Sequence, residues 1–211
     1  MTLLICMAVR TACYYNTNIL SYLIISLKEH VYKMPEIRPE TQQDIDAIGE
    51  VTGQAFGQQV EVDLVNHLRE HGRAVVSLVA EIDGRVVGHI LFSPATVESD
   101  NPTFEVLCLA PVSVLPAYQR QGIGSQLIRA ALEECRLLGH EVVVLVGHPE
   151  YYPRFGFVRA NALGLECEFE APDEAWMAIE LRPGALAGRK GRVKFQPEFQ
   201  DAVQKQPPRS R

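Results

Sequence analysis

The 211 residues suit one domain with tails, and 47% hydrophobic with 22% charged residues is ordinary for a packed protein, which excludes a wholly disordered chain. The formal net charge of -6 at pH 7 disfavours nucleic acid as a partner, because proteins that bind phosphate backbones are normally basic. The five cysteines include no Cys-x-x-Cys pair, so we expect neither a metal site nor a disulfide framework, but reduced thiols in a cytoplasmic protein.

Residues 1–33 differ from the rest of the chain, because apolar and aromatic residues dominate and charges are few. Their longest apolar run, 19–27, is too short to cross a bilayer, which needs about 20 residues. Neither a basic start nor a small-residue cleavage site marks a signal peptide. We interpret residues 1–33 as an extension outside the fold, with an amphipathic membrane anchor as the alternative, and expect no membrane partner. The functional domain is expected at 34–182, followed by a C-terminal segment and tail at 183–211.

Hydrophobic periodicity predicts alternating helices and strands from residue 36 onward. In chain order we expect a strand at 36–38, helices at 41–57 and 61–71, strands at 75–82, 86–97 and 104–115, a helix at 122–138, a strand at 141–146, a short helix from 149, a strand at 176–181 and a small edge strand at 193–195. Thr41 to Asp44 forms a capping box, and Asp83-Gly84 is a hairpin turn. Pro111 cannot donate to a sheet ladder, so we expect a bulge or splay there.

The segment from Val112 to Ser125 combines a strand, a polar loop, two spaced glycines (Gly122 and Gly124) and the start of a helix. Such a loop directs main-chain N–H groups at one point, and the helix N-terminus adds about half a positive charge. This pattern predicts an anion site suited to phosphate or pyrophosphate.

Two common phosphate-binding motifs do not fit the same loop. A P-loop needs a lysine after its second glycine, and none stands here. A dinucleotide fingerprint needs a third glycine three residues after Gly124, where Leu127 stands. An ordinary structural turn between strand and helix remains the alternative.

The run from Gln119 to Gly124, Gln-Arg-Gln-Gly-Ile-Gly, resembles the Gln/Arg-x-x-Gly-x-Gly/Ala signature of the GNAT superfamily of N-acetyltransferases. The resemblance implies a GNAT acyl-CoA N-acyltransferase fold, an α/β fold in which helices flank a mixed central sheet with a splayed, bulged central strand. It also implies that this loop cradles the coenzyme A pyrophosphate, while the main chain of the preceding strand pairs with the pantetheine arm. The coenzyme-binding residues implied are Val112, Val114, Gln119, Arg120, Gln121, Gly122, Ile123, Gly124 and Ser125. For Arg120, a solvated loop arginine is the alternative.

A second segment, Gly147 to Phe157, resembles the later motif of the same family, in which a short helix ends in a Gly-Phe pair. Its Tyr-Tyr-x-Arg-Phe-Gly-Phe run is similar to that of a bacterial subgroup of predicted acetyltransferases, and Tyr152 stands at the position of the family's usual tyrosine. The subgroup usually carries Asp where His148 stands, so no role is carried over to His148. The resemblance covers about residues 34–181.

Amine acetylation requires a donor for the oxyanion, a proton for the departing thiolate and the loss of a proton from the ammonium. The N–H of Val114 is the candidate oxyanion donor. Tyr152 is the candidate general acid, with a packing aromatic as the alternative. The ordinary pKa of tyrosine, about 10, lies close enough to that of a thiol, about 8.5, for a positioned donor to help. For the base, Glu105 is the first candidate, beside Glu81, His89 or a water chain.

The resemblance therefore implies an N-acetyltransferase that moves an acetyl group from acetyl-CoA, as co-substrate, to a primary amine on a small molecule or peptide, with a homodimer as an ordinary assembly. A non-catalytic acyl-CoA-binding or regulatory module on the same fold is the alternative, because fold alone does not fix function. Tyr152 favours the enzyme, since a degenerate module needs no proton donor there. A longer acyl donor or an oxygen acceptor also fits the motifs.

Overall fold

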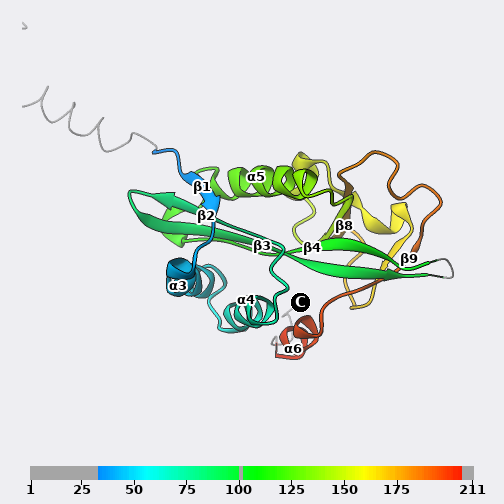
Figure 1. Ribbon diagram of the computed structural model, residues 1–211, viewed down its shortest axis with the longest axis horizontal. Helices are drawn as coiled ribbons and strands as arrows, with labels where there is room; N and C mark the ends of the chain where they lie inside the picture. Colours follow the sequence, from blue (N-terminus) through cyan, green and yellow to red (C-terminus); the bar gives the residue numbers. More distant parts are fainter. Residues whose placement is uncertain (1–32, 100–101, 206–211) are drawn as a thin grey trace, which may run out of the picture. The chain divides into compact units, whose positions relative to one another are not determined.

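The computed structural model describes residues 33–99 and 102–205, which include one compact unit beginning at Pro35 (Figure 1). The expectation for residues 1–33 lies, except for Lys33, outside the described residues, as do residues 206–211 of the expected tail. Within the described ranges, no helix is long and apolar enough to cross a membrane.

The described elements follow the expected order closely. They are β1 (Glu36–Pro39), α3 (Ile45–Phe56), α4 (Val60–Glu70), β2 (Val76–Ile82), β3 (Arg85–Glu98), β4 (Phe104–Val114), α5 (Ile123–Leu137), β5 (Val142–Val146), β6 (Val158–Arg159), β7 (Leu165–Cys167), β8 (Trp176–Glu180), β9 (Gly191–Lys194) and α6 (Pro197–Lys205). Short 3-10 helices occupy Gln42–Asp44, Pro116–Tyr118, Tyr152–Phe155 and Ala160–Leu163. The short helix expected from residue 149 is therefore a 3-10 turn that begins at Tyr152.

One mixed sheet forms the middle layer. Its strand order is β1-β2-β3-β4-β5-β8-β6, and β9 pairs with both β3 and β7. The pairs β4–β5 and β7–β9 are parallel, and the others are antiparallel. Helix α5 covers one face of the sheet, and α3 and α4 lie on the other (Figure 1). This arrangement confirms the expected α/β fold with a mixed central sheet.

The core is built by the apolar faces that the sequence periodicity indicates. Strand β5 is a continuous apolar run that is buried from Val142 to Leu145, and α5 buries Leu127, Ile128 and Ala131 completely. Gly88 of β3 brings α5 close to the sheet, because a Cβ there would lie 3.0 Å from Leu127 Cδ1 and 3.3 Å from the Ser113 carbonyl oxygen. Helix α5 therefore packs closely against the strands that form the site.

Strand β4 carries the irregularity expected at Pro111. Val112 pairs with Ile90 and Leu109 with Phe92, so β4 has one more residue than β3 between these two pairs. This extra residue is a β-bulge at Ala110–Pro111, which confirms the prediction. In the described chain, β4 pairs with β5 at Leu107 and Cys108. Beyond Cys108 the two strands separate, which confirms the splay.

The chain after Arg182 takes part in the same fold. Strand β9 pairs with the end of β3 at Thr96, Val97 and Glu98, so the expected strand is present and begins at Gly191. It is not an edge strand, because β7 pairs with its other side. Helix α6 was not expected. Its Glu198 lies 2.5 Å from His71 Nδ1 and accepts a hydrogen bond from Arg73, which anchors α6 beside α4.

Candidate functional site

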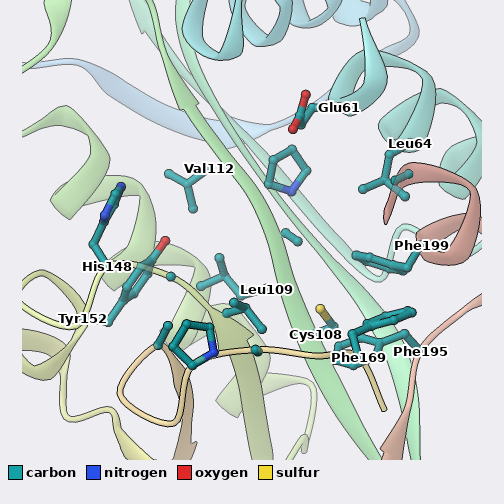
Figure 2. A pocket seen from close by; sticks show the side chains of 18 of the residues that line it. Glu61, Leu64, Cys108, Leu109, Val112, His148, Tyr152, Phe169, Phe195 and Phe199 are labelled. Atoms are coloured by element: carbon teal, nitrogen blue, oxygen red, sulfur yellow. The ribbon is translucent and has the colours of Figure 1, made fainter. Parts of the chain in front are cut away.

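A cavity of about 950 Å³ lies where β4 and β5 separate (Figure 2). One wall is β4 from Cys108 to Val112, and the opposite wall is the end of β5 with residues 147–149 and Tyr152. Residues of α3, α4 and α6 and the segment 169–175 complete the lining. The splay of the sheet, rather than a loop, therefore creates the candidate site.

The main chain of β4 turns an open edge toward the cleft. The N–H of Leu115 donates to the Val87 carbonyl at 2.9 Å, so the odd-numbered residues at this end of β4 bond to β3. By the alternation of an antiparallel ladder, Val112 and Val114 direct their N–H and C=O groups to the side that β5 has left. The Val114 carbonyl accepts a hydrogen bond from Gln119 Nε2 at 3.0 Å. The Val114 N–H is left as a donor at this edge.

The glycine loop ends in a helix start with free donors. Arg120 (φ 61°) and Gly122 (φ 85°) adopt left-handed conformations, and α5 begins directly after them at Ile123. Among the described residues, none of the N–H groups of residues 122–125 donates a hydrogen bond to another protein group. Gln119, Arg120, Gln121 and Gly122 are exposed. The loop thus has the geometry of an anion site at a helix N-terminus.

The second motif packs directly on this loop through Tyr151. The Tyr151 hydroxyl lies 3.2 Å from Ser125 Oγ, and either oxygen can donate. A Cβ at Gly124 would lie 3.2 Å from the same hydroxyl, so Gly124 leaves room for the tyrosine. Arg154 stacks its guanidinium 4.7 Å from the centre of the Tyr151 ring. Tyr151 therefore ties the two motifs together.

Tyr152 reaches the cleft from the opposite wall (Figure 2). Its ring makes edge contacts with Tyr151 and Phe157, at centroid distances of 5.2 and 5.8 Å. Burial, with smaller contributions from Tyr151 and Cys108, raises the pKa of Tyr152 to about 12. The phenol is therefore protonated at neutral pH and has a proton to give.

The structure does not bring the expected bases to the cleft. Glu105 is exposed and pairs across the sheet with Thr96, and it does not line the cavity. It stands seven residues from Val112 along β4, roughly 20 Å at the rise of a strand. Glu81 is bound to Arg38. His148 lines the cavity but is exposed.

His89 is buried instead and belongs to a polar cluster whose other members are partly buried. Its Nε2 is 2.9 Å from Ser77 Oγ and 3.5 Å from Glu40, and burial lowers the pKa of His89 against the opposing effect of Glu40. Glu40 in turn accepts two hydrogen bonds from Arg69. This agrees with the interpretation of His89 as a structural histidine.

Glu61 of α4 was not singled out from the sequence, yet it lines the cavity and is buried. One of its carboxylate oxygens accepts a hydrogen bond from Gln58 at 2.9 Å. The other oxygen, Oε2, is buried and has no hydrogen-bond partner in the part of the chain that the structure describes. The sequence held a signal for it, because Glu61 stands at helical spacing from the inward residues Leu64, Val65 and Leu68.

A metal site has no candidate ligands within residues 33–99 and 102–205, since no group of three His, Cys, Asp or Glu side chains there stands close enough to hold an ion. The chemistry available at the cleft is that of an anion-binding helix start, an open strand edge, a protonated phenol and a buried carboxylate.

Comparison with known proteins identifies the family to which this chain belongs. Residues 36–160 match a family model described as an acetyltransferase (GNAT) domain. The Escherichia coli K12 protein named uncharacterized N-acetyltransferase YjhQ is 40% identical over 157 residues, which cover 70% of this chain and 86% of YjhQ. The E. coli K12 protein named uncharacterized N-acetyltransferase YhbS is 33% identical over 164 residues, 77% of this chain and 97% of YhbS.

Two solved structures extend the likeness to the fold. The crystal structure of the E. coli GNAT family N-acetyltransferase YhbS in complex with CoA has a TM-score of 0.75 and 32% identity, and the match covers 79% of this chain and 92% of that one. A GNAT family acetyltransferase from Brucella melitensis in complex with acetyl-CoA has a TM-score of 0.64 and 35% identity, over 78% and 97% of the two chains. On the family model and these relatives, the chain belongs to the GNAT family of acetyltransferases.

Proposed function

We propose that this protein transfers the acetyl group of acetyl-CoA to a primary amine. The observation that carries the proposal is the meeting of two motifs: the loop with free helix-start donors packs on Tyr151, and the neighbouring Tyr152, partly buried and protonated, lines the cleft. The relatives from E. coli and Brucella melitensis, solved with CoA and acetyl-CoA, support the choice of donor.

The coenzyme fits the open groups of the cleft. The N–H groups of residues 122–125 would receive the pyrophosphate, helped by the positive end of the α5 dipole. Gln119, Arg120 and Gln121, exposed beside them, would contact the phosphates or the adjoining pantetheine. The pantetheine arm would then lie along β4, where its amide groups take the place of the β5 strand and pair with Val112, while the N–H of Val114 faces the thioester carbonyl.

The chemistry is direct attack by a neutral amine on the thioester carbonyl. The new C–N bond pushes charge onto the carbonyl oxygen, which the N–H of Val114 would stabilise by about 3 kcal/mol. The C–S bond then breaks, and Tyr152 protonates the departing thiolate of coenzyme A. The amine loses two protons in all from its ammonium form: one ends on the thiol and one is released.

Much of the acceleration needs no further catalytic group. Holding amine and thioester together can supply about 7–11 kcal/mol in ideal cases. Glu105, first candidate for the base, would act on the acceptor only through a chain of waters, given its place outside the cavity.

Calorimetric titration of the full-length protein with acetyl-CoA, with ATP and NAD as controls, tests the donor. Selective binding of acetyl-CoA, followed by release of free thiol on adding amines, is the expected result. Failure of the folded protein to bind acetyl-CoA would overturn the proposal. Binding without thiol release across a broad set of amines would instead support the non-catalytic acyl-CoA-binding module.

A further inference from the structure

The cavity has an aromatic end that the coenzyme chemistry does not use. Phe169, Phe195 and Phe199 gather there, from the segment before β8, the end of β9 and helix α6 (Figure 2). Phe169 and Phe195 stack with their ring centres 5.2 Å apart, and Phe195 and Phe199 are 5.5 Å apart. Burial of an apolar ligand group against these rings is favourable, whereas a charged group there would lose its hydration without gaining a polar partner.

The charged residues of the lining are all acidic. Glu61 is buried, Glu170 and Glu174 are exposed, and no lysine or arginine of the described residues lines the cavity. Gln58 donates to one oxygen of Glu61, and the other oxygen has no donor within residues 33–99 and 102–205. A buried carboxylate oxygen without a donor is costly, and the N–H groups of a bound ammonium would remove that cost.

We propose that the acceptor is a monoamine with an apolar body of about aromatic size and no carboxylate, and that Glu61 binds its ammonium group. This inference rests on the proposed function, since it names the acceptor for the same cleft. The apolar body lies against the phenylalanine wall, and the nitrogen lies at the Glu61 end. The bound ammonium must lose one proton before attack, and Glu61 is the buried carboxylate of the lining that can take it and pass it to solvent.

The same features argue against two other amine classes. The carboxylate of an amino acid would meet three carboxylates and no cation in the lining. The second ammonium of a diamine would have to lie against the aromatic wall, at the cost of its hydration. An arylalkylamine avoids both penalties.

The first test compares 2-phenylethylamine, phenylalanine and putrescine by the rate of thiol release from acetyl-CoA in the full-length enzyme. We expect kcat/KM for 2-phenylethylamine to exceed that for each of the others by at least about 100-fold, near 3 kcal/mol of discrimination. Equal or higher kcat/KM for phenylalanine or putrescine would overturn the inference while leaving the acetyltransferase activity intact. Absence of thiol release with every amine, phenylethylamine included, would count against the proposed function itself.

The second test assigns Glu61. Glu61→Gln keeps the shape of the side chain and removes its charge, and Glu70→Gln makes the same change at an exposed position of the same helix. Glu61→Gln should raise the KM for 2-phenylethylamine at least tenfold without changing the calorimetric Kd for acetyl-CoA, while Glu70→Gln changes neither. An unchanged KM in Glu61→Gln would remove Glu61 from the acceptor site.

A third variant probes the wall. Phe169→Ala should raise the KM for 2-phenylethylamine more than that for ethylamine, which is too small to span from Glu61 to the phenylalanines. An equal effect on both amines would show that Phe169 supports the fold rather than the acceptor.

Discussion

The ring of Tyr152 occupies the space that a side chain at Gly147 would need. A Cβ on Gly147 would come within 2.9 Å of Tyr152 Cδ2 and closer still to Cε2. Gly147 follows β5 directly, and its N–H donates to the carbonyl of Ala175, the residue before β8, at 2.9 Å. This hydrogen bond holds the main chain of Gly147 in place. The glycine therefore sets the position of the tyrosine that we propose as proton donor.

Gly147→Ala should displace Tyr152 and lower kcat by at least tenfold. Overpacking of this kind typically costs about 1–3 kcal/mol, so the free energy of unfolding should fall by a similar amount. Steady-state kinetics and urea unfolding measure the two effects. Gly49→Ala is the matched control, because its new Cβ would meet Val62 Cγ1 at an ordinary 3.7 Å. Full activity in Gly147→Ala would show that the tyrosine can move without consequence.

Tyr152→Phe should lower kcat by about 100-fold and leave the Kd for acetyl-CoA within about twofold, because it removes only the proton donor. Tyr151→Phe removes the hydroxyl that contacts Ser125 and keeps the ring, and it serves as the control. Stopped assays of thiol release with calorimetry separate the two parameters. If both variants lose activity equally, the hydroxyl of Tyr152 has no special part in the chemical step.

The pH profile gives an independent view of the same group. Burial, helped by Tyr151 and Cys108, raises the pKa of Tyr152 to about 12, so the phenol keeps its proton throughout the range in which the enzyme can be assayed. Between pH 7 and about pH 10, ionisation of Tyr152 should therefore not lower kcat. The wild type should show no fall of kcat in this range that Tyr152→Phe lacks. Such a fall would mean that Tyr152 ionises more easily than its buried position implies.

Most of the fold was predictable from the sequence because local pattern and tertiary role agree. The switch from helical spacing to a period of two marks β2, β3 and β4, and Pro111 marks the bulge at Ala110–Pro111. Helix α6 escaped prediction, because its residues are mostly polar. Its buried Phe199 and the bonds of Glu198 to His71 and Arg73 arise only when α4 stands beside it.

The candidate site likewise contains some residues that the sequence predicts and others that it does not. The glycine loop and Tyr152 stand in contiguous motifs, so their types and spacing could be read directly. Glu105 and Glu61 depend on long-range placement instead. Glu105 shares a strand with Val112 but stands at its far end, whereas Glu61 reaches the cleft because α4 packs across the face of the sheet that carries the bulge. The helical spacing of Glu61 indicates an inward position, but no local pattern places either glutamate relative to the cleft.

Gly122→Asp should weaken acetyl-CoA binding by at least tenfold, about 1.4 kcal/mol, because it places a negative charge at the proposed pyrophosphate site. Gly122 has φ 85°, so any side chain there adds some backbone strain. Gly122→Asn is the control, since asparagine has nearly the same shape, tolerates this conformation and carries no charge. Calorimetric Kd values that rise equally in both variants would assign the loss of affinity to strain and move the pyrophosphate elsewhere.

The cluster that buried His89 forms with the partly buried Glu40, Arg69 and Ser77 should make the fold sensitive to acid. Burial alone would raise the pKa of Glu40, but hydrogen bonds from Arg69, His89 and Ser77 and the charge of Arg69 outweigh it and hold that pKa well below the ordinary 4.5. A carboxyl whose pKa is lower in the folded state stabilises the protein above the unfolded pKa, and that contribution is lost as the pH falls through the folded pKa. Glu40 should therefore contribute fully at pH 7 and progressively less below about pH 4.5.

Glu40→Gln should lower the free energy of unfolding at pH 7 by about 3 kcal/mol, because Arg69 then loses its charged partner. The difference from the wild type should shrink when urea unfolding is repeated at pH values below 4. Glu36→Gln, at an exposed position in neighbouring β1, should change stability little at either pH. A gap between wild type and Glu40→Gln that stays constant from pH 7 to the acid range would contradict a lowered pKa for Glu40. It would assign the loss to the changed shape and hydrogen bonding of the cluster rather than to its charge.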